Sequence, residues 1–151
     1  MKKILLGAAA LSVMFATSCK KNDDKSGPSS TFTLAGTSYS PSTVAKQSTG
    51  SVTVLMGTDQ TNSFGVMFNT VPTANGTYKI MEDATAADEV QIVAANGQTT
   101  LYGSLDNTAT ATVSVNGGKI TVTVPEISAE RTNMTTMKTD TVKVSGTLVE
   151  N

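Results

Sequence analysis

The feature that most constrains the fold of this chain is an alternation of apolar and polar side chains across residues 108–124. On each side of a central turn every second side chain is apolar, at Ala109, Ala111, Val113, Val115, Ile120, Val122 and Val124. A period of two places these side chains on one face of an extended strand, whereas a helix would spread them around its axis. Asn116-Gly117-Gly118 supplies the turn. The segment is therefore predicted to form a β-hairpin with one face on a core and the other in water.

Shorter runs of the same kind continue from residue 31 to residue 149. Predicted strands cover residues 31–34, 37–39, 51–56, 64–68, 77–80, 89–94, 98–102 and 141–149. Hairpin turns are predicted at Ala35-Gly36 and Asn96-Gly97, because glycine and asparagine tolerate a positive φ. Residues 57–62 and 128–138 are predicted to be loops, and Pro125 is predicted to end a ladder or mark a sheet edge. The predicted centre of the core is one strand face that carries Phe64, Val66 and Phe68.

Nine or ten short strands with no helix to cover them must bury their apolar faces against one another. The predicted fold is an all-β antiparallel β-sandwich formed by residues 31–151 as one domain, with a closed lipocalin-like barrel as the alternative. The sandwich is favoured because the inward residues are mostly valine, alanine and isoleucine, which fill a thin core. A barrel that holds a ligand usually lines its cavity with larger aromatic side chains.

The first eighteen residues have the three parts of an export signal. Lys2 and Lys3 give a basic start, residues 4–16 are almost entirely apolar, and small residues precede Cys19. The apolar run is shorter than the roughly 20 residues that a membrane-spanning helix needs. Residues 1–18 are therefore predicted to be a signal peptide that is removed.

The end of this signal resembles the lipobox of bacterial lipoproteins, in the loose form found in Bacteroidota. Ala16-Thr17-Ser18 precedes Cys19, the single cysteine of the chain. The resemblance implies cleavage before Cys19, diacylglycerol on its sulfur, and attachment to the outer membrane through lipid alone. The Ser145-Gly146-Thr147-Leu148 stretch and the hydroxyl-rich hairpins are similar to those of small β-sandwich lipoproteins of unknown function in the same phylum. A plain secretory signal with an incidental or buried thiol is the alternative.

Residues 19–30 are predicted to be a lipidated, solvated tether. Charged residues followed by serine, glycine and proline bury little apolar area. The eleven residues after Cys19 span about 35 to 40 Å when extended and about 18 Å when relaxed. The stretch that contains Lys21, Asp23 and Asp24 resembles the signals that send Bacteroidota lipoproteins to the cell surface, and a simple solvated charge run is the alternative.

The composition excludes several classes of chemistry. The chain has no histidine, no tryptophan and one cysteine, so Ser-His-Asp and Cys-His catalysis, zinc sites with nitrogen or sulfur ligands, and haem ligation by histidine are ruled out. Without the signal and tether, six basic and ten acidic residues remain, which argues against nucleic acid as a partner. No enzyme activity, catalytic residue, metal or cofactor is predicted.

Three groups of residues are candidates for binding or modification. Tyr39, Tyr78 and Tyr102 would stack on sugar rings if they faced outward. The acidic stretch with Glu82, Asp83, Asp88 and Glu89 offers oxygen ligands for calcium, but its spacing matches no calcium loop, so a solvated connection with at most one helical turn is favoured. Met134 and Met137 would suit an adaptable partner surface, although a loop folded onto its own hairpin is preferred. Asp140-Thr141-Val142 resembles the O-glycosylation acceptor of exported Bacteroidota proteins, with Thr141 as the modified residue.

These features predict a lipid-anchored protein of the outer membrane, displayed at the cell surface. Its domain is predicted to be a non-enzymatic binding or structural accessory of an unknown envelope partner. The alternative is a glycan-binding accessory of an outer-membrane nutrient uptake system. The membrane is a partner only through the lipid anchor, because a mildly acidic domain is not attracted to an anionic lipid surface.

Overall fold

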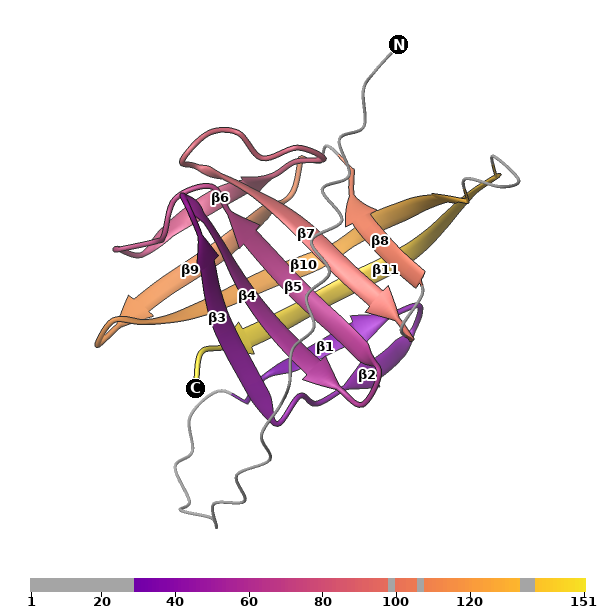
Figure 1. Ribbon diagram of the computed structural model, residues 1–151, viewed down its shortest axis with the longest axis horizontal. Coiled ribbons are helices and arrows are strands. Elements are labelled where there is room, and N and C mark those ends of the chain that lie inside the picture. Colours follow the sequence, from indigo (N-terminus) through magenta and orange to yellow (C-terminus); the bar gives the residue numbers. More distant parts are fainter. Residues whose placement is uncertain (1–28, 98–99, 106–107, 134–137) are drawn as a thin grey trace.

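The computed structural model describes residues 29–97, 100–105, 108–133 and 138–151, without the side chains of residues 132 and 133. These residues form eleven strands and no helix (Figure 1), and none of them belongs to a helix long and apolar enough to span a membrane. The strands are β1 (Thr31–Leu34), β2 (Thr37–Tyr39), β3 (Thr43–Thr49), β4 (Val52–Asp59), β5 (Asn62–Phe68), β6 (Gly76–Ile80), β7 (Glu89–Asn96), β8 (Thr100–Ser104), β9 (Thr110–Asn116), β10 (Lys119–Asn133) and β11 (Lys138–Val149).

The strands form one sheet in the order β2-β1-β11-β10-β9-β6-β7-β5-β4-β3, and β8 pairs with both β7 and β10. Pairing is antiparallel except between β6 and β7. Figure 1 shows the sheet folded into two layers whose strands cross. We call β3, β4, β5 and β7 the front layer and β9, β10, β11 and β1 the back layer; β6 and β8 connect them. The predicted all-β sandwich is confirmed.

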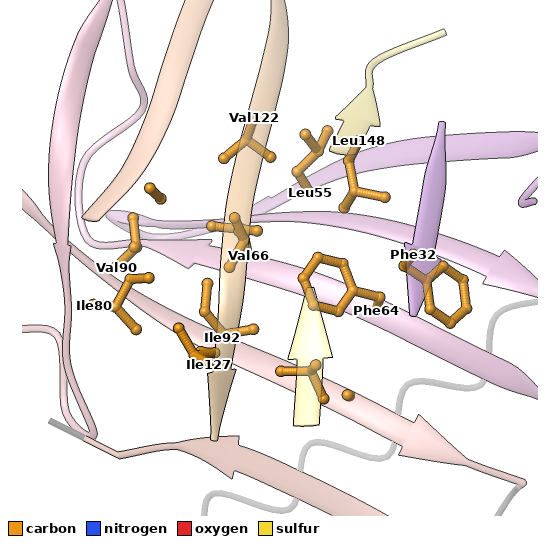
Figure 2. Packing of buried hydrophobic residues seen from close by; sticks show 14 of the residues in the cluster. Phe32, Leu55, Phe64, Val66, Ile80, Val90, Ile92, Val122, Ile127 and Leu148 are labelled. Carbon is orange, nitrogen blue, oxygen red and sulfur yellow. The ribbon is translucent and has the colours of Figure 1, made fainter. Parts of the chain in front are cut away.

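The core lies between the two layers and is built almost entirely from aliphatic and phenylalanine side chains (Figure 2). Phe64, Val66 and Phe68 of β5 are completely buried, as predicted. The back layer meets them with the alternate residues of its strands, including Ala111, Val113, Ile120, Val122, Val124, Val144 and Leu148. The predicted inward face of residues 108–124 is therefore the observed one.

The predicted tight turns are present. Ala35 and Gly36 have φ values of 51° and 81°, and Gly117 and Gly118 have values of 59° and 79°. Two consecutive positive φ values are typical of the turn whose twist matches that of a two-stranded hairpin. β7 and β8 pair with each other as a third hairpin, in which Asn96 lies opposite Thr100.

Two loop predictions are wrong and one strand was not predicted, because these segments are strands with little apolar burial. β3 was not predicted, since Val44 is the single buried residue among its seven. Residues 57–59 extend β4, and a short turn at Gln60 leads into β5. The predicted loop at 128–138 is largely strand, because β10 continues to Asn133 and β11 begins at Lys138.

Pro125 lies just beyond the β9–β10 ladder, whose last pair is Thr123 opposite Thr112, as predicted for that hairpin, but it does not end the strand β10. β10 continues through it, and the pairing with β11 shifts register between Val124 and Ile127. Proline has no backbone N–H to donate, so a bulge at this point removes the need for a hydrogen bond there. Beyond the bulge, residues 128–133 and 138–143 form a hairpin that we call the arm. Figure 1 shows the arm extending past β8 and away from the layers.

Candidate functional site

β4 has apolar residues on both of its faces. Thr53, Leu55 and Gly57 are buried toward the core, whereas Val52, Val54 and Met56 point outward and are half-buried. The inward direction is set by long-range contacts: Gly57 lies against Leu148 and Pro41, so closely that an added Cβ would come within 2.8 Å of the leucine. The outward side chains of β4 are therefore candidates for an external contact.

The outward residues of the neighbouring strands continue this surface in register. One row across the sheet consists of Ala45, Met56, Gly65, Val93 and Gly103. Adjacent rows consist of Gln47, Val54, Met67 and Gln91, and of Thr43, Thr58, Ser63, Ala95 and Leu101. None of these positions is charged. We call this surface the apolar face; Glu130 of β10, opposite Gly103, marks its boundary.

The apolar face has raised and hollow parts. The end of Met56 lies over Gly65, where an added Cβ would come within 2.7 Å of the methionine methyl group. An added Cβ at Gly103 would meet nothing within 4 Å, so the surface beside it is open. Leu101, two residues earlier on β8, is 55% exposed. A hollow of about 50 Å³ lies at the other side of the face, beside Val52, Met67 and Gln91.

The outer side of the back layer has a groove. The groove measures about 390 Å³ and is lined by Thr33, Ala35, Gly36, Glu126 and residues 141–145. The Lys143 ammonium donates a hydrogen bond to Ser128 Oγ at 3.0 Å. The volume lies near the lower limit of ordinary ligand pockets, and its wall is formed by the last residues of β1 and the free side of β11.

A polar cluster joins β8 to the arm. The Tyr102 hydroxyl donates to Asp140 Oδ2 at 3.0 Å, and Arg131 Nε lies 3.6 Å from the same oxygen. The Arg131 guanidinium is also 5.8 Å from the centre of the Tyr102 ring. Burial and the neighbouring Asp140 carboxylate both raise the pKa of Tyr102. The tyrosine therefore stays protonated and serves as a hydrogen-bond donor that positions the arm.

The three candidate tyrosines are not brought together. Tyr39 stacks on Phe32 with ring centres 5.0 Å apart, and Tyr78 meets Phe68 edge-on at 5.6 Å. Tyr102 is buried in the core cluster and faces Asp140. Each ring thus has a partner within the protein, and the described residues form no shared aromatic platform for a sugar ring.

The acidic stretch holds the connection between β6 and β7 in place. Glu89 Oε2 accepts the backbone N–H groups of Thr85 at 2.9 Å and of Ala86 at 3.0 Å, which lowers the pKa of Glu89. Asp88 pairs with Lys79 at 3.0 Å in an exposed position. No helical turn is present at residues 81–88, and the described residues contain no group of three acidic or cysteine side chains that could hold a metal.

Several predicted residues lie outside the described part of the chain, namely Cys19, Lys21, Asp23, Asp24, Met134 and Met137. The chain enters the sheet at Ser30, whose hydroxyl accepts a hydrogen bond from Val149 N at 2.9 Å. Thr141 is exposed on β11 opposite Glu130. Its neighbour Asp140 is held by Tyr102, so the acceptor-like Asp140-Thr141-Val142 stretch is an ordered strand and not a loose loop.

The apolar face was not predicted from the sequence. Its signal was present in residues 51–56, where both alternating sets contain large apolar side chains. A strand with this pattern is either covered on both sides or contacts something on its outer side. Comparison of the chain with protein-family models, curated proteins and solved structures finds no match.

Proposed function

We propose that this chain is a lipid-anchored cell-envelope protein whose β-sandwich is a non-enzymatic binding or structural accessory, and that the apolar face is its contact surface. The observation that carries the proposal is the combination of aliphatic side chains and absent charge across the outward rows of β3, β4, β5, β7 and β8. Of these side chains Leu101 is exposed and Val54, Met56, Met67 and Val93 are half-buried, so an apolar partner surface would bury what remains accessible. The partner is an envelope protein with an uncharged apolar surface of its own.

The energetic argument concerns Met56, Met67 and Leu101. Their side chains remain partly or mostly exposed in the isolated chain. Removing such surface from water is worth roughly 25 cal/mol per Å² of apolar area. Methionine also adapts its shape to irregular partners, and the open surface beside Gly103 offers space for a side chain from outside.

The anchor is the second element of the proposal. Cys19 carries the lipid, and the tether of residues 20–30 separates it from the first contact of the sheet at Ser30. An extended reach of about 35 to 40 Å lets the domain turn the apolar face toward a neighbour in the same membrane. Lys21, Asp23 and Asp24 direct the protein to the outer side of that membrane.

The contact surface is tested by photo-crosslinking in intact cells. A Met56→Lys/Leu101→Lys variant places two charges on the apolar face, and we expect it to lose the crosslinked envelope partner. The matched control, Ser114→Lys/Thr123→Lys, adds the same charges to exposed hydroxyl residues on the outer side of the back layer that do not lie opposite each other. Equal crosslinking by wild type and both variants would exclude the apolar face as the contact surface.

The anchor is tested separately through Cys19→Ser. We expect this variant to lose fatty-acid labelling and to leave the membrane fraction, while the domain keeps its unfolding midpoint. Ser18→Cys/Cys19→Ser is a control that restores a thiol one position earlier and tests whether the position matters. Membrane retention of Cys19→Ser would contradict lipid anchoring and leave the proposal for the apolar face intact.

A further inference from the structure

The arm has one edge without a neighbouring strand. On the other side of the hairpin, Ala129 and Glu130 of β10 pair with β8. β1 pairs with β11 from Val144 to Thr147, and its last contact is the hydrogen bond from Ala35 N to Lys143 O at 3.0 Å. The turn at Ala35-Gly36 then takes the chain away. Within the described residues, 138–142 have no strand partner on this side.

Backbone groups of Thr139 and Thr141 point out of this edge. Because Lys143 O accepts from Ala35, the backbone polar groups of Lys143 face the β1 side, and every second residue of a strand does the same. Residues 138–141 are all exposed. The groove of about 390 Å³ begins beside Thr141, next to this edge. Such an edge is a template for strand addition.

We propose that this edge pairs with the same edge of a second copy of the chain, antiparallel and about a two-fold axis at Thr139. Within the described residues, the pairing joins residues 138–140 of β11 in one copy to the same residues of the other. Thr139 lies opposite its own counterpart, Lys138 lies opposite Asp140 of the partner subunit, and the partner subunit's Lys138 lies opposite Asp140. The surface is self-complementary, as a two-fold interface requires.

Charge selects this register over its neighbours. If the axis moves by one residue to Asp140, two aspartates lie opposite each other. If it moves to Lys138, two lysines do so. Opposite charges across an antiparallel pair are favourable and like charges are unfavourable. An axis at Thr141 would bring the second strand onto Lys143, whose carbonyl is already used by Ala35.

The contacts of Asp140 fix its carboxylate before pairing. Tyr102 and Arg131 both approach Oδ2, at 3.0 Å and 3.6 Å. The side chain is still 53% exposed, so Lys138 of the partner subunit can reach it. A short edge of this kind associates weakly in solution, and attachment of two copies to one membrane would raise their effective concentration. The pairing itself does not depend on the anchor or on the apolar face.

Disulfide trapping tests the pairing directly, because the chain has a single cysteine and lipidation would block it. In the proposed register the two Thr139 Cα atoms are about 5.5 Å apart, within the roughly 4.4–6.8 Å that a disulfide spans. We expect full-length Thr139→Cys to form a covalent dimer under mild oxidation in its membrane. The control Thr49→Cys places a thiol at an exposed residue of β3, the strand that ends the sheet, outside the rows that form the apolar face.

A second substitution checks the register. Lys138→Glu in the Thr139→Cys background turns two attractive pairs into repulsive ones, and we expect the dimer yield to fall about fivefold. Lys119→Glu, on the exposed start of β10, should leave the yield unchanged. A Thr139→Cys yield no higher than that of Thr49→Cys would overturn the pairing. A yield that Lys138→Glu does not lower would also overturn it.

Discussion

The outer sides of the two layers differ in chemistry although both layers use the same alternation to face the core. Front-layer strands turn Val54, Met56 and Met67 outward, and β7 adds Val93. Back-layer strands turn hydroxyl groups and lysines outward, with Thr112, Thr121, Thr123, Lys143, Ser145 and Thr147 among them.

The back layer has the side-chain pattern of an antiparallel sheet with one buried face and one solvated face. Its outward threonines bond one another, as in the 3.2 Å contact between Thr123 Oγ1 and Thr147 Oγ1, and they remain compatible with water. The front layer departs from this pattern without any strand of the described chain to cover it. The core explains the inward residues of both layers, but it does not explain the outward residues of the front layer. That difference is the physical reason for assigning function to the apolar face.

The largest expected effect on stability comes from replacing an inward glycine of the back layer by valine. The same replacement at an outward glycine of the front layer serves as the comparison. Gly146 of β11 faces Phe32 and Phe64, and an added Cβ would lie 2.9 Å from the Thr31 carbonyl oxygen. Gly146→Val should therefore lower the free energy of unfolding by about 3 kcal/mol or more, because backbone and core rings cannot move aside. Chemical denaturation with a linear fit measures this change.

Gly65→Val is the matched substitution on the apolar face. An added Cβ there would meet the flexible end of Met56, which can turn toward solvent, and Val93 Cγ2 at 3.0 Å, which must shift slightly. We expect a loss below about 1 kcal/mol. If Gly65→Val cost as much as Gly146→Val, the apolar face would be packed as rigidly as the core, and the contrast between inward and outward sides would fail.

The sequence predicted those parts of the fold that local signals determine. Strict alternation and glycine turns located the hairpin of β9 and β10 and the buried face of β5. β3 and the arm were missed for the opposite reason. Both are strands held by backbone pairing with little burial, and β3 has Val44 alone in the core. No apolar period exists in such segments to reveal them.

The candidate site was less predictable because it depends on contacts between distant residues. Whether Val54 or Leu55 of β4 faces the core is decided by the approach of Gly57 to Leu148 across the two layers. The partners of Tyr102 are Asp140 and Arg131, 38 and 29 positions further along the chain. Composition shows that tyrosine is scarce, but only the folded structure shows that Tyr39 and Tyr78 pack on phenylalanine rings.

An intermediate effect is expected where the two layers are joined at the end of β11. Glu150 Oε1 pairs with Lys46 of β3 at 2.8 Å, and its Oε2 accepts the backbone N–H of Ile120 at 2.9 Å. Burial alone would raise the pKa of Glu150, but the hydrogen bonds from Lys46 and Ile120 and the nearby lysine charges outweigh it and lower the pKa below 4.5. The carboxylate therefore links the front layer to the back layer in its ionised form.

Glu150→Gln should lower the free energy of unfolding by about 1 kcal/mol at pH 7. Because the folded pKa lies below the unfolded one, the carboxylate stabilises the fold fully above the unfolded pKa, and this contribution is lost as pH falls through the folded pKa. Wild type and variant should thus converge in acid when unfolding is followed against pH. Glu126→Gln, at an exposed position, is the control. A constant difference down to pH 2 would show that the charge of Glu150 does not join the layers.

The smallest effect on stability is expected when the back layer is given the chemistry of the front layer. Thr123→Val/Thr147→Val replaces the exposed hydroxyl pair by two apolar side chains and keeps their shape and strand preference. The free energy of unfolding should change by less than about 0.5 kcal/mol, while binding of a hydrophobic dye should increase. A loss of more than about 1 kcal/mol would mean that the hydroxyl pair supports the sheet. An unchanged stability would show that folding does not determine the outward residues of either layer. The apolar outward residues of the front layer would then need a reason other than folding.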